Sequence, residues 1–124
     1  MLVAEDEPLV RMLAVDILEE EGFTVVEAST ASAALALLEK RSDVTALFTD
    51  IDMPGGMNGL ELASVVHERW PDVALVVTSG VFRPAADRLP DEGVFLQKPY
   101  ATSAPVRVIR ELIRQKGRGS ASLA

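Results

Sequence analysis

The stretch "LFTDIDMPGGMNGLEL", residues 47–62, decides which fold and chemistry this sequence predicts. It begins as an apolar run typical of a buried strand and then changes to Asp50, Asp52 and a glycine-rich turn. A carboxylate at the end of a buried strand is costly to desolvate unless it is paired. We therefore expect Asp50 to have a cationic partner or a chemical task.

Apolar runs and amphipathic segments alternate along the rest of the chain. Runs that predict strands lie at residues 2–4, 23–28, 44–49, 73–78 and 94–97. The run "VALVVT" at 73–78 is continuously apolar, which is typical of a strand buried on both faces of a parallel sheet.

Helical periodicity follows most of these strands. Pro8 suits the start of a first helix that ends before Gly22, and Ser29 or Thr30 can cap a second helix. The spacing predicts further helices over about 60–70, 84–89 and 105–116, the one at 84–89 being short because prolines and glycines surround it.

Five strands alternating with five helices predict an α/β fold. Parallel strands need right-handed crossovers, so we expect a flavodoxin-like (βα)5 doubly wound parallel sheet with strand order 2-1-3-4-5. One domain covers residues 1–116, and the polar segment 117–124 is expected to be a flexible C-terminal tail.

Composition narrows the functional classes. The 124 residues carry a net charge of −7, which argues against nucleic-acid binding, and they include no cysteine. The N-terminal segment has acids where a signal peptide has basic residues, and no apolar run approaches the roughly 18 residues of a membrane span. We expect a soluble cytoplasmic protein without membrane contact.

Polar side chains follow four of the predicted strands, and a shared sheet edge would bring them together. These residues are Glu5, Asp6, Asp50, Thr78 and Lys98. Two carboxylates about 5 Å apart repel by roughly 3 kcal/mol at an effective dielectric of about 20, so three of them call for a cation. Oxygen ligands without sulfur or histidine favour Mg²⁺.

The remaining two side chains suit a phosphoryl group. Thr78 offers a hydroxyl and Lys98 an ammonium, both of which donate to phosphoryl oxygens. Phosphoryl transfer depends mainly on alignment and charge neutralisation, and Asp50 is a carboxylate that could attack phosphorus to form an acyl phosphate.

Four segments carry a resemblance to a known family. They are "VAEDE" at 3–7, "TDIDMPGGMNG" at 49–59, "VVTSG" at 76–80 and "FLQKPY" at 95–100. In this order they make the chain, over about residues 1–116, similar to the single-domain, CheY-like receiver domains of two-component response regulators.

The resemblance implies a role for each matching residue. Asp50 would be the phosphoacceptor, and Thr78 and Lys98 would bind phosphoryl oxygens, with a cis peptide before Pro99 directing the lysine. Mg²⁺ would be held by Asp6, Asp50 and the backbone carbonyl of Asp52, with Glu5 acting mainly through water. Switching would couple Thr78 to Phe95, which lacks the hydroxyl of a tyrosine and so would signal by packing alone.

The implied function is that of a phosphoacceptor switch in a phosphorelay. A sensor histidine kinase or phosphotransfer protein would phosphorylate the chain, which would act on a downstream protein as a monomer or weak homodimer. It would catalyse only its own phosphorylation and dephosphorylation and would not be an enzyme with an outside substrate.

Two other functions stay open at this point. The motif "FTDIDMP" contains the Asp-x-Asp of haloacid-dehalogenase-type phosphatases, although those enzymes place it after their first strand. The chain could also be a receiver-like interaction module that does not use phosphate.

The role of Asp52 also stays open. It could be a solvated loop acid or could influence how water reaches the phosphoryl group.

Three features depart from the family pattern. The loop after Pro54 is one residue longer than the common spacing, and the interval 78–98 is short and contains prolines, which puts a regular fourth helix in question. Only eight residues follow Lys116, so we expect no effector domain in this chain.

Overall fold

A computed structural model describes the backbone of residues 1–123, apart from residues 54, 81–88 and 91–92, and the side chains of these residues as far as Lys116. The strands are β1 (Leu2–Ala4), β2 (Val26–Ala28), β3 (Ala46–Asp50), β4 (Ala74–Ser79) and β5 (Val94–Gln97). The helices are α1 (Pro8–Glu20), α2 (Ala31–Lys40), α3 (Gly59–Arg69) and α4 (Ala104–Leu123).

The strands form one parallel sheet in the order β2-β1-β3-β4-β5. This is the predicted flavodoxin-like order, and it places β1 and β3 side by side. Their register pairs Ala4 with Thr49, so the residues that follow β1 lie next to the last residue of β3. The sheet order therefore brings the predicted site residues to one edge.

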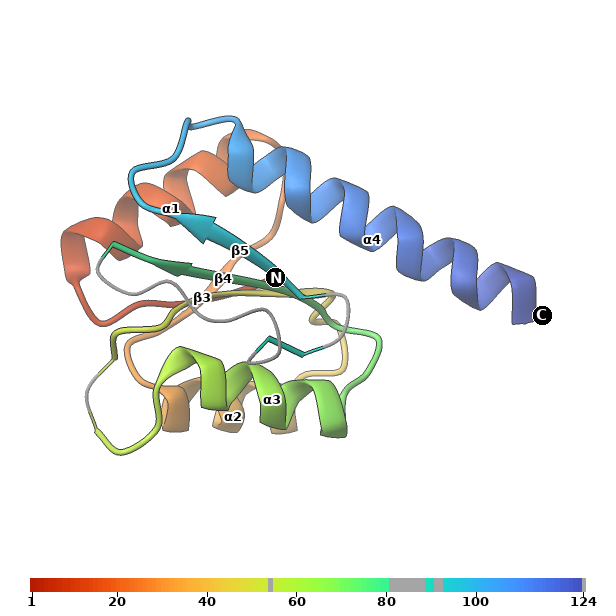
Figure 1. The fold of residues 1–124 in the computed structure, drawn as a ribbon, viewed down its shortest axis with the longest axis horizontal. Helices are drawn as coiled ribbons and strands as arrows, with labels where there is room; N and C mark the ends of the chain where they lie inside the picture. Colours follow the sequence, from red (N-terminus) through yellow and green to blue (C-terminus); the bar gives the residue numbers. More distant parts are fainter. Residues whose placement is uncertain (54, 81–88, 91–92, 124) are drawn as a thin grey trace.

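Helices cover both faces of the sheet (Figure 1). Helices α1 and α4 lie on one face, and α2 and α3 lie on the other. Alternate residues of β3 point to opposite sides: Leu47 packs in the core beneath α2 and α3, whereas Phe48 packs in the core beneath α1 and α4. Because both faces are covered, β3 and β4 are buried along their whole length, as continuous apolar runs predict.

Local signals fix where the helices begin. Pro8 occupies the first turn of α1, where its missing N–H is not needed. Thr30 caps α2 by accepting a hydrogen bond from the N–H of Ala33, which confirms one of the two predicted caps. Helix α3 begins with a capping box in which Asn58 and Glu61 satisfy each other's backbone N–H groups.

Two predicted boundaries were wrong. The last helix does not end near Lys116, because the backbone of α4 stays helical to Leu123. The glycines at 117 and 119 each cost only about 1 kcal/mol in a helix, and no proline interrupts the segment. The mobility of residues 117–124 stays a prediction.

The second strand is also shorter than predicted. It spans Val26–Ala28 instead of starting at Phe23, because it pairs only with the three residues of β1. Phe23 and Val25 still pack against the core, which explains their apolar character. The short helix predicted near 84–89 lies almost wholly outside the described residues.

Within the described ranges, no helix combines the length and the apolar composition that crossing a bilayer requires.

Candidate functional site

Three carboxylates meet at the carboxyl edge of the sheet. Asp50 is the last residue of β3, and Glu5 and Asp6 directly follow β1. One carboxylate oxygen from each of the three lies within 4.8 Å of the others. Glu5 and Asp50 are buried, with exposed fractions of 4% and 6%, whereas Asp6 is half-buried. The predicted acidic cluster is therefore present.

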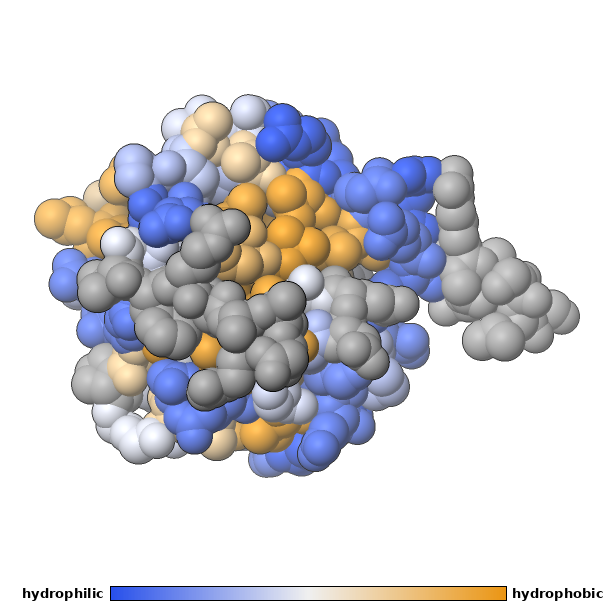
Figure 2. Space-filling model, in the orientation of Figure 1, coloured by the Kyte–Doolittle hydropathy of each residue, from blue (hydrophilic) through white to orange (hydrophobic). Residues whose placement is uncertain are grey.

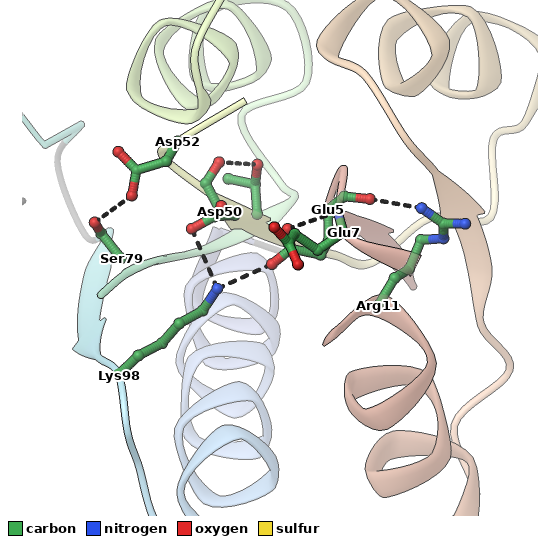
Figure 3. A network of polar contacts seen from close by, with 8 residues as sticks. Glu5, Glu7, Arg11, Asp50, Asp52, Ser79 and Lys98 are labelled. Carbon is green, nitrogen blue, oxygen red and sulfur yellow. Dashed lines mark hydrogen bonds and ion pairs between the residues drawn. The ribbon is translucent and has the colours of Figure 1, made fainter. Parts of the chain in front are cut away.

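Lys98 reaches into this cluster from the end of β5 (Figure 3). Its Nζ lies 2.9 Å from Oε1 of Glu5 and 3.4 Å from Oδ1 of Asp50. The backbone N–H of Lys98 donates to the carbonyl of Ser79 at 3.0 Å, which fixes the start of the side chain. The peptide bond between Lys98 and Pro99 is cis, as the resemblance implies. One ammonium thus lies between two buried carboxylates.

The local electrostatics are unfavourable for the acids despite this lysine. Burial is the main cause that raises the pKa of Glu5 and of Asp50, and repulsion from Asp52 adds to the shift at Asp50. Burial works against the charged form of Lys98, yet its contacts with Glu5 and Asp50 raise its pKa overall. Burial, more than charge repulsion, therefore makes the charged forms of Glu5 and Asp50 costly.

Thr78 adds a hydroxyl at the same edge of the sheet. It is paired in register with Asp50 and is 1% exposed. Within the described residues, its Oγ1 has no hydrogen-bond partner. Such a buried hydroxyl costs free energy, so it suggests a partner that binds only in another state of the protein.

The turn after Asp50 brings Gly59 close against the backbone of Asp50. The N–H groups of Met53 and Gly59 both donate to the carbonyl of Ile51, at 2.9 Å and 3.0 Å. A Cβ atom on Gly59 would lie 2.0 Å from the backbone oxygen of Asp50. Only glycine fits there, which gives the last glycine of the "MPGGMNG" loop a steric reason.

Two further predicted residues lie beside the cluster. The Asp52 side chain is exposed and accepts a hydrogen bond of 2.6 Å from Oγ of Ser79. Phe95 is half-buried on β5 and packs against the core beneath α2 and α3. The roles proposed for the Asp52 carbonyl and for Phe95 stay predictions.

The donor set fits Mg²⁺. The three clustered carboxylates supply hard oxygen ligands, and the cluster includes no thiolate or imidazole. Glu5 and Asp50 have raised pKa values, which a bound cation would lower again. The residues present therefore suit the cation that the sequence predicts.

The sequence reasoning missed one residue of this region. Arg11, in the second turn of α1, donates from Nη1 to the backbone carbonyl of Glu5 at 2.8 Å (Figure 3). No sequence signal identified it, because arginines on amphipathic helices usually face solvent. Gly59 is part of the motif "TDIDMPGGMNG", but its contact with Asp50 depends on the folded turn.

Comparison with known proteins agrees with this geometry. The response regulator receiver domain family matches residues 1–110. The chain is 31% identical over 120 residues to the sensor kinase CckA of Brucella abortus, which covers 94% of this chain and 13% of that protein. It is 32% identical over 106 residues to the transcriptional regulatory protein PdtaR of Mycobacterium tuberculosis, which covers 83% of this chain and 51% of that protein.

The fold also matches solved structures. A response regulator receiver domain protein from Clostridium thermocellum aligns with a TM-score of 0.86 at 22% identity, covering 94% of each chain. The chain spans about half or less of the length of the two curated relatives. On the family match and the shared fold, the chain belongs to the response regulator receiver domains, the phosphoacceptor modules of two-component signalling.

Proposed function

We propose that Asp50 is the phosphoacceptor of this receiver domain and that Mg²⁺ bound beside it supports the reaction. The observation that carries this proposal is the convergence of Glu5, Asp6, Asp50 and Lys98 at one edge of the sheet. Asp50 is the most central of the three acids, because it ends β3, the middle strand of the sheet.

The transfer step uses the Asp50 carboxylate as the nucleophile. A carboxylate oxygen attacks the phosphorus of a phosphohistidine, a P–O bond forms, and the P–N bond breaks. The imidazole leaves and takes up a proton from solvent. Hydrolysis reverses the modification: water attacks the phosphorus, the bond to Asp50 breaks, and inorganic phosphate and the carboxylate are released together with a proton.

Lys98 and Thr78 bind the phosphoryl oxygens in this proposal. Lys98 already lies 3.4 Å from Asp50, so its ammonium can neutralise charge on the incoming group. The buried Thr78 hydroxyl, which lacks a partner within the described residues, gains one when it donates to a phosphoryl oxygen. Movement of Thr78 toward the phosphate then changes the packing around Phe95, which would be the switch.

Glu5, Asp6, Asp50 and the backbone carbonyl of Asp52 are the residues that would hold Mg²⁺. When bound, this cation neutralises charge on the transferring phosphoryl group. Glu5 keeps one oxygen on Lys98 and receives the N–H of Glu7 on the other, so it suits a water-mediated role.

The phosphoryl donor in this proposal is a sensor histidine kinase or a phosphotransfer protein. Such a partner must cover the acidic edge of the sheet, and α1 begins two residues after Asp6. Leu9, Met12 and Leu13 of α1 are exposed by 71%, 50% and 60%. Figure 2 shows hydrophobic residues on the left rim of the molecule, where the first turns of α1 lie in Figure 1. We place partner contact on this face of α1.

The α1 contact can be tested apart from the chemistry. We expect Leu13→Asp to slow phosphotransfer from a cognate kinase by about tenfold, because an exposed apolar contact is replaced by a charge. Phosphorylation by acetyl phosphate should keep its wild-type rate, since that small donor needs no docking surface. Equal slowing with both donors would contradict the assignment.

In this proposal, the chain catalyses its own phosphorylation and dephosphorylation and has no outside substrate. The phosphatase alternative is not favoured, because the family match is to receivers and because Asp52, its required general acid, bonds to Ser79. The phosphate-independent module is not favoured either, since the acceptor, lysine and hydroxyl are all present.

The decisive experiment is mass spectrometry after incubation with acetyl phosphate and Mg²⁺. We expect the wild-type chain to gain one phosphate and Asp50→Asn to gain none. Asp43→Asn is the matched control, because it makes the same chemical change in an exposed acid before the other end of β3, and it should gain one phosphate. A folded wild-type chain that stays unmodified would refute the proposal.

A further inference from the structure

We propose that Arg11 is a positioning residue for the acidic cluster: it fixes the peptide that joins Glu5 to Asp6 and so sets the affinity for Mg²⁺. The guanidinium makes two contacts in different directions. Its Nη1 donates to the backbone carbonyl of Glu5 at 2.8 Å, and its Nε donates to Oε1 of Glu27 on β2 at 3.2 Å. This inference rests on the proposed function.

The first contact completes the fixation of Glu5. The N–H of Glu5 donates to the carbonyl of Ala28 at 3.0 Å, and its side chain bonds to Lys98. Arg11 binds the remaining polar group of this residue, its carbonyl, from the side away from Lys98 (Figure 3). The peptide group between Glu5 and Asp6 is therefore held at its own carbonyl by Arg11, and the preceding peptide group is held by Ala28.

The position of the Asp6 carboxylate depends on the Glu5–Asp6 peptide more than the positions of the Glu5 and Asp50 carboxylates do. Within the part of the chain that the structure describes, the Asp6 carboxylate accepts no hydrogen bond, whereas Glu5 and Asp50 both bond to Lys98. Its place in the cluster is consequently set by the backbone. A peptide that can rotate would let Asp6 leave the other two acids.

The second contact orients the guanidinium. Glu27 lies on the edge strand β2 and is half exposed, whereas the Arg11 side chain is only 21% exposed. An arginine can serve both oxygens at once because its N–H groups point in fixed and different directions, which a lysine ammonium cannot reproduce. The two contacts link the edge strand to the loop that carries the acids.

The positioning role and simple charge repulsion predict opposite effects of removing Arg11 on the affinity for Mg²⁺. A positive charge beside a cation site repels Mg²⁺, so removing Arg11 would strengthen metal binding if charge alone mattered. If Arg11 acts through the Glu5–Asp6 peptide, removing it weakens binding. Outer residues that orient metal ligands typically change affinity by about tenfold to a hundredfold.

The test is Mg²⁺ calorimetry on the wild type, Arg11→Ala and Arg11→Lys. We expect both variants to bind Mg²⁺ about tenfold to a hundredfold more weakly, because neither makes both contacts. Arg41→Ala is the control: it removes an arginine from an exposed pair with Asp43, before the opposite end of β3, and should bind as the wild type does. Tighter binding by Arg11→Ala together with wild-type binding by Arg11→Lys would overturn the inference.

A second measurement needs no metal. Amide hydrogen exchange at Glu5 in the metal-free protein should be faster in both Arg11 variants than in Arg41→Ala, because the carbonyl of Glu5 has lost its hydrogen bond to the Arg11 guanidinium. Arg11→Lys keeps the charge and most of the aliphatic stem, so it guards against a variant that does not fold. Unchanged exchange at Glu5 would contradict the positioning role.

The outcomes separate this inference from the function on which it rests. A wild-type chain that binds no Mg²⁺ and takes up no phosphate overturns both. A wild-type chain that does both, alongside Arg11→Lys with wild-type affinity, overturns only the role of Arg11.

Discussion

The two ends of β3 place aspartates in opposite electrostatic conditions. Asp43, three residues before the strand, is exposed, and its hydrogen bonds with Arg41 lower its pKa. Asp50, the last residue of the strand, is buried, and that burial raises its pKa although Lys98 is close. The first acid is satisfied by the protein alone, whereas the second lies in a cluster whose charge a bound cation would relieve.

This difference shows why residue type alone does not identify a site. Both acids flank the same strand and both contact a basic side chain. What distinguishes Asp50 is burial, two neighbouring carboxylates and a hydroxyl without a partner among the described residues. Each of these conditions can be changed separately.

The largest expected effect comes from breaking the turn that fixes Asp50. In Gly59→Ala the new Cβ would lie 2.0 Å from the backbone oxygen of Asp50, so the turn must move. We expect a loss of about 3 kcal/mol in the free energy of unfolding, measured with urea. Gly80→Ala is the control, because its Cβ would meet nothing closer than 3.7 Å, and it should be near neutral. Equal effects would show that the turn tolerates a side chain.

The next effect is stabilisation by Mg²⁺ at the Asp50 end only. A cation at about 100 times its dissociation constant should raise the free energy of unfolding by about 2.7 kcal/mol. Asp6→Asn should lose most of this increment, because it removes one carboxylate of the cluster, whereas Asp43→Asn should keep it. Urea unfolding with and without Mg²⁺ measures the increment, and an equal loss in both variants would argue for nonspecific screening.

A smaller effect concerns two buried threonines. The hydroxyl of Thr49 donates to the carbonyl of Asp50 at 3.1 Å, whereas that of Thr78 has no partner within the described residues. Without phosphate, Thr49→Val should destabilise the chain by about 1 kcal/mol, and Thr78→Val should stabilise it by about 1 kcal/mol. Urea unfolding of the two variants tests this, and destabilisation by Thr78→Val would indicate an existing partner.

The smallest effect is the opposite pH dependence of the two aspartates in metal-free protein. Folding raises the pKa of Asp50, so the folded state binds that proton more tightly and stability falls as the pH rises above about 4. Folding lowers the pKa of Asp43, so its contribution is present above about pH 4 and is lost as the pH falls further.

This comparison calls for unfolding curves between pH 3 and pH 7 in a chelator. Asp50→Asn should gain stability relative to the wild type as the pH rises from about 4 to about 7. Asp43→Asn should be less stable than the wild type above about pH 4 and should match it at lower pH. Parallel curves for the two variants would mean that burial does not distinguish the two acids.

The sequence predicted the strand order and the members of the cluster because both follow from local patterns. The apolar runs located β1, β3, β4 and β5 to within two residues, and the strand ends then gave Glu5, Asp6, Asp50, Thr78 and Lys98. It could not predict contacts that depend on how separate elements meet. The Arg11 contact with Glu5 and the approach of Gly59 to Asp50 are of this kind.

The boundaries that failed have a similar cause. The start of β2 depends on the length of its neighbour β1, and the end of α4 depends on whether the helix continues through two glycines. A short stretch of sequence determines neither boundary. The hydrogen bond from Ser79 to Asp52 also joins the end of β4 to the loop after β3, and their relative position is defined only by the fold.

The unsatisfied hydroxyl of Thr78 has an evolutionary consequence. A valine of nearly the same shape would stabilise the resting protein, so selection for stability should favour valine wherever the threonine has no function. Among descendants of this chain that lose the acceptor aspartate, aliphatic residues should therefore accumulate at this position, whereas lineages that keep the aspartate should retain a hydroxyl.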